Sequence, residues 1–201
     1  MVKAIIFDLG RVLVPFDFTR GYELMAARCP FSASEIPERL RHTDLVVKFE
    51  SGQVEPKDFV AQISRILDFE SSYSEFCEIW SSIFLPYTLL PEALVEALRR
   101  RYRMVLLSNT NAIHYPMVKA KYPILRHFDS YVLSYEVGAM KPSPLIYQAA
   151  VRQAGCAAGE CFFTDDIAAF VEGARREGID AVQFESREQI ERELRSRGVD
   201  W

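Results

Sequence analysis

Acidic, hydroxyl and basic side chains occur at four places in the sequence, and three of these places end a short apolar run. Asp8 follows the first run, Ser108 ends the second, and Asp165 and Asp166 follow a later one. Lys141 lies in a loop that precedes a helical pattern. A carboxylate can attack as a nucleophile, a hydroxyl and an ammonium can hold anionic oxygens, and paired acids can bind a hard cation such as Mg²⁺. Together these residue types predict phosphoryl transfer through an aspartyl phosphate.

The apolar runs predict the strands that position these side chains. An uninterrupted apolar run that ends at a turn signal is typical of a strand buried on both faces of a parallel sheet. The runs are Lys3–Phe7, Met104–Leu107, Tyr131–Leu133, Cys161–Thr164 and Ala181–Phe184. The helical patterns that alternate with the last four are Asn111–Lys121, Pro144–Ala154, Ile167–Glu177 and Glu188–Arg197. This alternation predicts an α/β fold with a doubly wound parallel sheet, in which the polar strand ends meet at one crevice.

The stretch between the first two strands is expected to form a helical insert. It contains no clear strand, and its helical patterns are Tyr22–Ala27, Ala33–Arg41, Pro56–Leu67 and Ser74–Phe84. A further helix, Pro91–Arg100, leads back to the sheet. We expect residues 1–16 and 87–201 to form a catalytic core and residues 17–86 to form a cap. Both connections of the insert flank the strand that ends in Asp8, so we expect a lid over the crevice. A helical decoration packed elsewhere is the alternative.

Composition argues against nucleic acid and membranes as binding partners. The chain of 201 residues is 49% hydrophobic and 26% charged, as is usual for a globular protein. The formal net charge is −4, which argues against the excess of basic residues that nucleic-acid binding needs. No apolar stretch reaches the length of a membrane span and no apolar leader opens the sequence, so we expect a cytoplasmic protein without a membrane partner. The four cysteines lack metal-ligand spacing, and free thiols are the favoured interpretation.

The sequence resembles the haloacid dehalogenase superfamily, in the branch with a helical cap inserted after the first motif. The motifs occur in order as Phe7-Asp8-Leu9-Gly10, Leu107-Ser108-Asn109-Thr110, Lys141-Pro142 and Phe163-Thr164-Asp165-Asp166. The segment Phe49-Glu50-Ser51-Gly52, followed by a helix, is typical of such caps. The resemblance extends over essentially the whole chain. Asp-Leu-Gly combined with Ser-Asn-Thr-Asn is most similar to bacterial phosphatases that act on sugar phosphates such as a hexose 1-phosphate.

The resemblance implies a Rossmann-like core and a role for each motif residue. Asp8 would be the nucleophile, and Ser108 and Lys141 would bind the transferring phosphoryl group, with Asn109 beside them at the substrate. Lys141 would also lower the pKa of Asp8 by its proximity. The Mg²⁺ ligands would be Asp8, the backbone carbonyl of Gly10, Asp166 and Asp165, the last either as a ligand or as an acceptor outside the first coordination sphere.

Three positions depart from the family pattern. Gly10 stands where a second aspartate usually serves as general acid and base, which leaves Asp17 and His114 as the nearest substitutes in the sequence. Phe170 stands where an asparagine is frequent, which predicts weakened metal affinity. Arg11 stands where glycine or asparagine is common. It could point toward the cap and a carboxylate or phosphate of the substrate, or lie on the surface.

These features favour a Mg²⁺-dependent phosphomonoesterase for a small phosphorylated metabolite, with a sugar phosphate as the preferred substrate. The protein would be a monomer or a homodimer. A metal-independent 2-haloacid dehalogenase, in which the same aspartate attacks carbon, is one alternative. A catalytically weak protein that binds phosphometabolites or a protein partner is the other. Glu50 and Lys48 could also reach the crevice from the cap.

Overall fold

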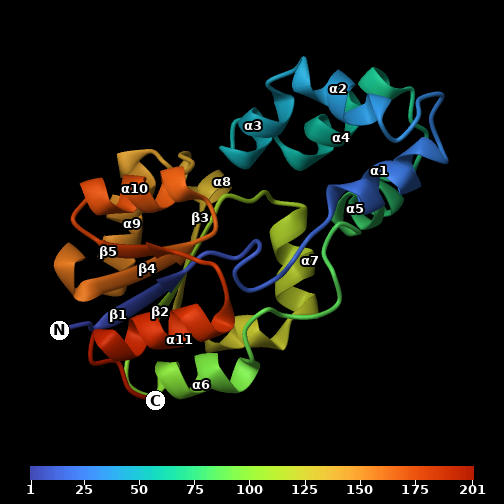
Figure 1. The fold of residues 1–201 in the computed structure, drawn as a ribbon. Coiled ribbons are helices and arrows are strands. Elements are labelled where there is room, and N and C mark those ends of the chain that lie inside the picture. The colour runs from blue at the N-terminus through green and yellow to red at the C-terminus, as the bar shows by residue number, and fades with distance from the viewer.

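The computed structural model describes residues 1–201, and a five-stranded parallel sheet forms the centre of its larger lobe, at the left in Figure 1. Its strands are β1 (Ala4–Phe7), β2 (Arg103–Ser108), β3 (Ser130–Leu133), β4 (Cys161–Asp165) and β5 (Asp180–Gln183), in the order β3-β2-β1-β4-β5. Phe7 pairs with Leu106 on one side and with Thr164 on the other. The residues that follow these three positions therefore meet at one edge of the sheet.

Helices cover both faces of the sheet. Ile5 and Phe7 point to one face, where they pack against α6 (Glu92–Arg99), α7 (His114–Lys121), the short helix η1 (Pro123–His127) and α11 (Arg187–Ser196). Ala4 and Ile6 point to the other face, toward α9 (Pro144–Ala154) and α10 (Ala168–Arg176). This alternation follows from the two-residue period of a strand. The predicted doubly wound α/β architecture is confirmed.

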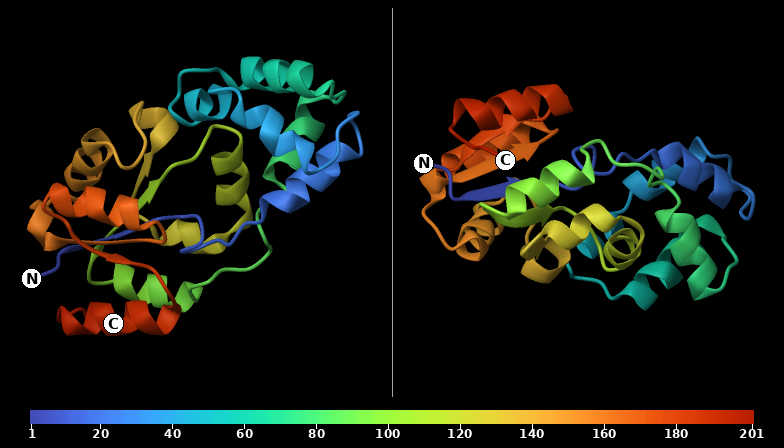
Figure 2. Two further views of the ribbon diagram at one scale, coloured as in Figure 1. Left: turned by 45° about the horizontal axis from the view of Figure 1, so that its top comes forward. Right: turned by 90° about the horizontal axis from the view of Figure 1, so that it is seen from below.

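Five helices form a second lobe between β1 and β2 (Figure 2). They are α1 (Phe18–Ala26), α2 (Glu35–Arg41), α3 (Leu45–Glu50), α4 (Pro56–Leu67) and α5 (Tyr73–Ser81). This lobe has its own apolar core, in which the rings of Phe49 and Phe59 stack with centroids 4.0 Å apart. Ile113, from the loop after β2, belongs to the same core and joins the lobe to the sheet.

Local hydrogen bonds explain where the helices begin. Helix α1 starts earlier than predicted because the Asp17 side chain accepts a hydrogen bond from the N–H of Thr19 at 2.9 Å. Helix α7 starts later than predicted because the Asn111 side chain accepts from the N–H groups of Ile113 and His114. The sequence patterns missed α3 and three short helices, η1, α8 (Ser134–Val137) and η2 (Ala158–Glu160). No helix of this fold combines the length and the apolar composition that crossing a membrane requires.

The end of α3 touches the sheet lobe at Gly52. This residue has a φ of +72°, and a Cβ added there would lie 2.1 Å from the carbonyl oxygen of Tyr135 in α8. We expect Gly52→Ala to lower the free energy of unfolding by about 1–2 kcal/mol for the left-handed backbone, and by a further ~1–3 kcal/mol for the overlap with Tyr135. Urea unfolding would measure both contributions together.

Gly138 provides a matched control for this substitution. Its φ is +75°, but a Cβ added there would meet no atom within 4 Å. Gly138→Ala should therefore carry only the backbone cost. Equal destabilisation by the two substitutions would contradict a tight contact between the lobes at Gly52.

Candidate active site

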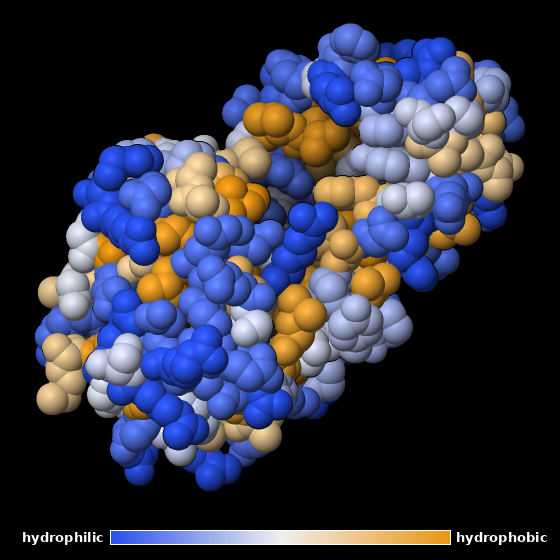
Figure 3. Space-filling view, viewed as in Figure 1, coloured by the Kyte–Doolittle hydropathy of each residue, from blue (hydrophilic) through white to orange (hydrophobic).

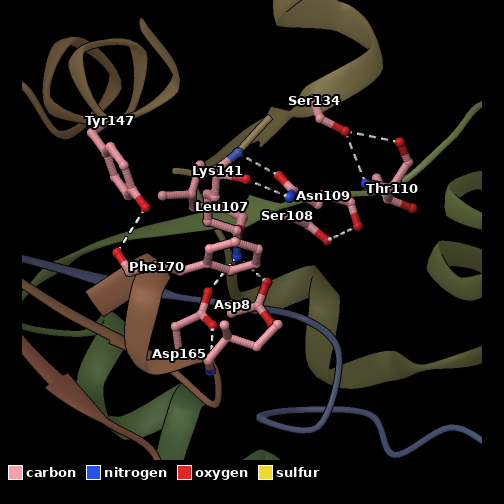
Figure 4. A network of polar contacts seen from close by, with 11 residues as sticks. Asp8, Leu107, Ser108, Asn109, Thr110, Ser134, Lys141, Tyr147, Asp165 and Phe170 are labelled. Atoms are coloured by element: carbon pink, nitrogen blue, oxygen red, sulfur yellow. Dashed lines mark hydrogen bonds and ion pairs between the residues drawn. The ribbon is translucent and has the colours of Figure 1, made fainter. Parts of the chain in front are cut away.

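A buried lysine connects two aspartates at the carboxyl edge of the sheet (Figure 4). The Nζ atom of Lys141 lies 2.6 Å from Oδ1 of Asp8 and 2.5 Å from Oδ2 of Asp165. It also donates to the carbonyl oxygen of Leu107 at 3.3 Å. All three charged residues are buried, with exposed fractions of 6% or less. Burying a charge is costly unless an opposite charge or a hydrogen bond compensates it, and here the lysine and the two aspartates compensate one another.

The cluster shifts the proton affinities of its members. Burial raises the pKa of Asp8 to about 7, against the lowering effect of Lys141, and Asp165 raises it further. Burial lowers the pKa of Lys141, but the charges of Asp8 and Asp165 outweigh it and raise the pKa above its usual value. The lysine therefore stays charged. The predicted lowering effect of Lys141 on the pKa of Asp8 is present, but burial contributes more and the net shift is upward.

The three aspartates of this edge form a group that fits a hard cation. One carboxylate oxygen from each of Asp8, Asp165 and Asp166 lies within 4.8 Å of the others. Asp165 is already engaged, because Oδ2 accepts from Lys141 and Oδ1 accepts from the N–H of Ile167 at 2.9 Å. Asp166 is half-buried and takes part in no ion pair. Carboxylate oxygens are the ligands that Mg²⁺ prefers, so the donor set suits this metal.

Ser108 and Asn109 lie at the end of β2, beside the lysine. Ser108 is buried, and its hydroxyl makes only a long contact, 3.4 Å, with the carbonyl oxygen of Asn109. The Asn109 side chain accepts from the Lys141 N–H at 2.8 Å and donates to the Lys141 carbonyl at 3.1 Å. The predicted substrate-binding residue Asn109 therefore uses its amide to hold the lysine-bearing loop in place.

The side chain of Phe170 covers the lysine from α10. The ring centroid of Phe170 lies 5.2 Å from Nζ of Lys141, within range of a cation–π interaction. The backbone carbonyl of Phe170 accepts from the hydroxyl of Tyr147 at 2.7 Å, which fixes this turn of α10 (Figure 4). The ring thus shields the ammonium from water at the position where the sequence departs from the family pattern.

Three further residues predicted at the site lie around its edge. Arg11 is exposed, with its guanidinium 4.8 Å from the ring centroid of Phe16. Burial raises the pKa of Asp166, and the charge of Arg11 only partly opposes this shift. Asp17 is also exposed, and its carboxylate caps α1. His114 is buried, with Nδ1 at 3.2 Å from the Asn111 amide nitrogen and Nε2 at 2.9 Å from the Trp80 carbonyl oxygen. The histidine therefore has no free ring nitrogen.

The buried imidazole of His114 should make stability depend on pH. Burial lowers its pKa to about 4 from an ordinary value of 6.5, so the unfolded chain binds the proton more readily than the folded chain. The stabilisation is complete above about pH 6.5 and declines as the pH falls toward 4, by at most ~3 kcal/mol. We expect His114→Gln to flatten this part of the pH dependence in urea unfolding. His42→Gln changes an exposed histidine and should leave the dependence as it is. A dependence unchanged in His114→Gln would contradict this role of the buried ring.

A small pocket next to Leu9 and Gly10, the two residues after Asp8, opens toward the helical lobe. Its volume is about 80 Å³, and its lining includes Leu9, Gly10, Ser108, Asn109, Glu50 and His114. A larger cavity of about 440 Å³ lies between α1, α2, α3 and α5, and Glu50 and His114 also line it. Figure 3 shows apolar side chains in the hollow between the two lobes. The small pocket lies at the strand ends, the larger cavity lies in the helical lobe, and the two share Glu50 and His114.

Comparisons with known proteins agree with this geometry. Residues 2–178 match the model of a family described as haloacid dehalogenase-like hydrolase. The chain is 30% identical to a phosphatase of Mycobacterium tuberculosis, over 98% of this chain and 96% of that protein. It is 24% identical to the D-ribitol-5-phosphate phosphatase of Bacteroides thetaiotaomicron, over 100% and 95% of the two chains.

A solved structure supports the same relationship. The crystal structure of a haloacid dehalogenase family enzyme of B. thetaiotaomicron, in complex with magnesium and inorganic phosphate, is 28% identical, with a TM-score of 0.83 over 93% of this chain and 96% of that chain. Three carboxylates, a buried lysine and a buried serine at the edge of a parallel sheet are the residues on which the sequence resemblance rests. The chain belongs to the haloacid dehalogenase-like hydrolase family and is a hydrolase.

Proposed function

We propose that this hydrolase is a Mg²⁺-dependent phosphomonoesterase that acts on a small phosphorylated metabolite through an aspartyl phosphate on Asp8. The observation that carries the proposal is the position of Lys141, buried between Asp8 and Asp165. The lysine leaves Oδ2 of Asp8 available as a nucleophile and supplies a positive charge for the phosphoryl group. The relatives named as phosphatases support the same activity.

Each polar residue of the crevice has its own role in the proposed reaction. An oxygen of Asp8 attacks phosphorus, the bond from phosphorus to the ester oxygen breaks, and water later attacks the phosphoryl group and releases phosphate. Lys141 and the hydroxyl of Ser108 hold the anionic oxygens as charge shifts among them. Asp8, Asp166 and Asp165, with the carbonyl of Gly10, would hold Mg²⁺. When bound, the metal neutralises the charge that would repel a phosphate dianion from the acidic cluster.

The preferred substrate is proposed to be a sugar phosphate or polyol phosphate. We propose that residues 17–86 act as a cap and close over it. Polar groups are available along the largely apolar cavity, because Arg41, Thr43 and Trp80 all contribute to its lining. The buried indole N–H of Trp80 has no hydrogen-bond partner in the protein and could donate to a hydroxyl group. The named substrate of the Bacteroides relative, a polyol phosphate, supports this class.

Metal removal is the direct test of this function. Phosphate release would be measured on D-ribitol 5-phosphate, a hexose 1-phosphate and p-nitrophenyl phosphate, with Mg²⁺ and with excess EDTA. We expect turnover with Mg²⁺, loss of turnover in EDTA, and recovery on addition of Mg²⁺. Turnover that survives EDTA would contradict the metal requirement. Chloride release from 2-chloropropionate without phosphatase activity would replace this proposal with the dehalogenase alternative.

A further inference from the structure

We propose that Glu50, which reaches the active-site pocket from α3, donates the leaving-group proton and then accepts a proton from the attacking water. This inference rests on the proposed function. An alkoxide is a poor leaving group unless it receives a proton as the bond to phosphorus breaks, and water attacks well only if a base removes its proton. The pocket must therefore contain a group that can do both.

The choice of group follows from the pocket lining. Of the side chains that line the 80 Å³ pocket, only Glu50 and His114 can titrate. His114 is unsuitable because the carbonyl oxygen of Trp80 requires Nε2 to carry the proton, while the Asn111 amide donates to Nδ1. Asp17 caps α1 and contributes to the lining of neither the pocket nor the cavity. Glu50 remains.

The strand end itself offers no alternative. Gly10, two residues after Asp8, has no side chain, and a Cβ added there would lie 2.7 Å from Cε1 of Phe16. The Phe16 ring packs against Phe18 and Phe84, with centroids 5.0 and 6.2 Å apart. An acidic side chain at position 10 would have to displace this aromatic cluster. The proton donor therefore has to come from the facing lobe.

The end of α3 that carries Glu50 packs against the sheet lobe. The Asn111 side chain lies near enough to the Glu50 carboxylate to lower its pKa, and Asn111 is a fully buried residue whose side-chain oxygen accepts from the N–H groups of Ile113 and His114. Two residues after Glu50, Gly52 packs against the carbonyl oxygen of Tyr135. These contacts fix the end of α3 against the sheet lobe, so Glu50 stays beside the strand ends.

The environment of Glu50 suits a group that must both lose and gain a proton. Burial raises its pKa to about 7, and the hydrogen bond from Asn111 only partly opposes this shift. None of the charged groups nearby shifts this pKa. They are Arg41, which lines the larger cavity, and Lys57, Asp58, Arg65 and Glu136 on α4 and α8, which pack against α3. A general acid is most effective when its pKa lies near the working pH.

Glu50 alone can supply and recover the proton that one catalytic cycle needs. In the first step, Asp8 bonds to phosphorus, the ester oxygen leaves and takes the proton of Glu50, and Glu50 becomes a carboxylate. In the second step, that carboxylate removes a proton from water as the water oxygen bonds to phosphorus and the Asp8–phosphoryl bond breaks. Alcohol and phosphate are released, and Glu50 is protonated again.

Comparing two leaving groups in Glu50→Gln tests the inference. Glutamine keeps the size and polarity of the neutral acid but can neither give nor take the proton. On D-ribitol 5-phosphate we expect kcat to fall by ~10²–10⁴-fold. On p-nitrophenyl phosphate, whose phenolate leaves without a proton, we expect a rapid burst of one equivalent of p-nitrophenolate followed by slow turnover, because only the second step needs the base.

The controls separate the possible failures. Glu70→Gln changes an exposed glutamate of the same lobe and should match the wild type, and melting curves of both variants would show that they are folded. Wild-type kcat on D-ribitol 5-phosphate in Glu50→Gln would overturn the inference while leaving the proposed function intact. Loss of the burst in parallel with the alkyl phosphate would also overturn it, because both substrates would then need Glu50 for binding or folding. No phosphate release by the wild type would overturn the proposed function and this inference with it.

Discussion

Asp8→Asn should abolish turnover of every phosphate ester, with kcat at least ~10³-fold below the wild type. Asparagine keeps the size of the side chain, but its amide cannot attack phosphorus or carry the charge that pairs with Lys141. Unlike Glu50→Gln, Asp8→Asn should show neither a burst of p-nitrophenolate nor steady-state turnover, because the covalent step itself is lost. Stopped-flow absorbance on p-nitrophenyl phosphate would measure both phases in one experiment.

A matched substitution in the helical lobe controls for this variant. Asp58→Asn changes an exposed aspartate in the first turn of α4 and should leave kcat within about 2-fold of the wild type. Turnover by Asp8→Asn above one-tenth of the wild-type rate would mean that another group forms the covalent bond. The proposal of an aspartyl phosphate on Asp8 would then be abandoned.

Lys141→Met is expected to have the largest effect on stability. The substitution leaves Asp8 and Asp165 buried beside each other without their shared cation. Breaking a buried ion pair by removing one partner costs about 3–5 kcal/mol. For a chain of this size that corresponds to a melting temperature lower by about 6–20 °C. Differential scanning calorimetry at neutral pH would measure the change.

The metal offers a second readout for this variant. A divalent cation that binds only the folded chain raises its stability. It should raise the melting temperature of Lys141→Met more than that of the wild type, because the variant has one positive charge fewer among three carboxylates. Lys57→Met changes an exposed lysine of α4 and should melt within about 2 °C of the wild type. A melting temperature for Lys141→Met equal to that of the wild type would show that the lysine contributes nothing to stability.

Much of the fold could be predicted from the sequence because the strong patterns are local. The five apolar runs became five strands, and α4 and α9 have the predicted bounds, each starting at a proline. Helix α3 escaped prediction for a physical reason. Its six residues include the β-branched pair Val46 and Val47, and its first turn has no side-chain cap. The packing of Phe49 against Phe59 stabilises this helix, and such packing is invisible in a local pattern.

In the candidate site, too, the sequence predicted what is local and missed what depends on long-range contacts. The motifs identified the residues at the strand ends, because parallel strands bring their carboxyl ends together. They did not show that Asn109 binds the backbone of Lys141 or that Glu50 shares a pocket with Ser108. Nor did they show that both nitrogens of His114 are engaged. These facts depend on contacts between distant segments, and no spacing within a single segment reports them.

The central position of β1 has a consequence for how this chain folds during synthesis. Ala4 pairs with Arg103 and Cys161, so the first strand to leave the ribosome waits for partners that come much later. The helical lobe, by contrast, can bury most of its own core as soon as α5 has emerged. Until β4 is complete, the apolar residues of β1 lack one of their two neighbouring strands and are open to association with other chains. A chain that stops before Cys161 would therefore be a folded helical lobe attached to an aggregation-prone half-sheet.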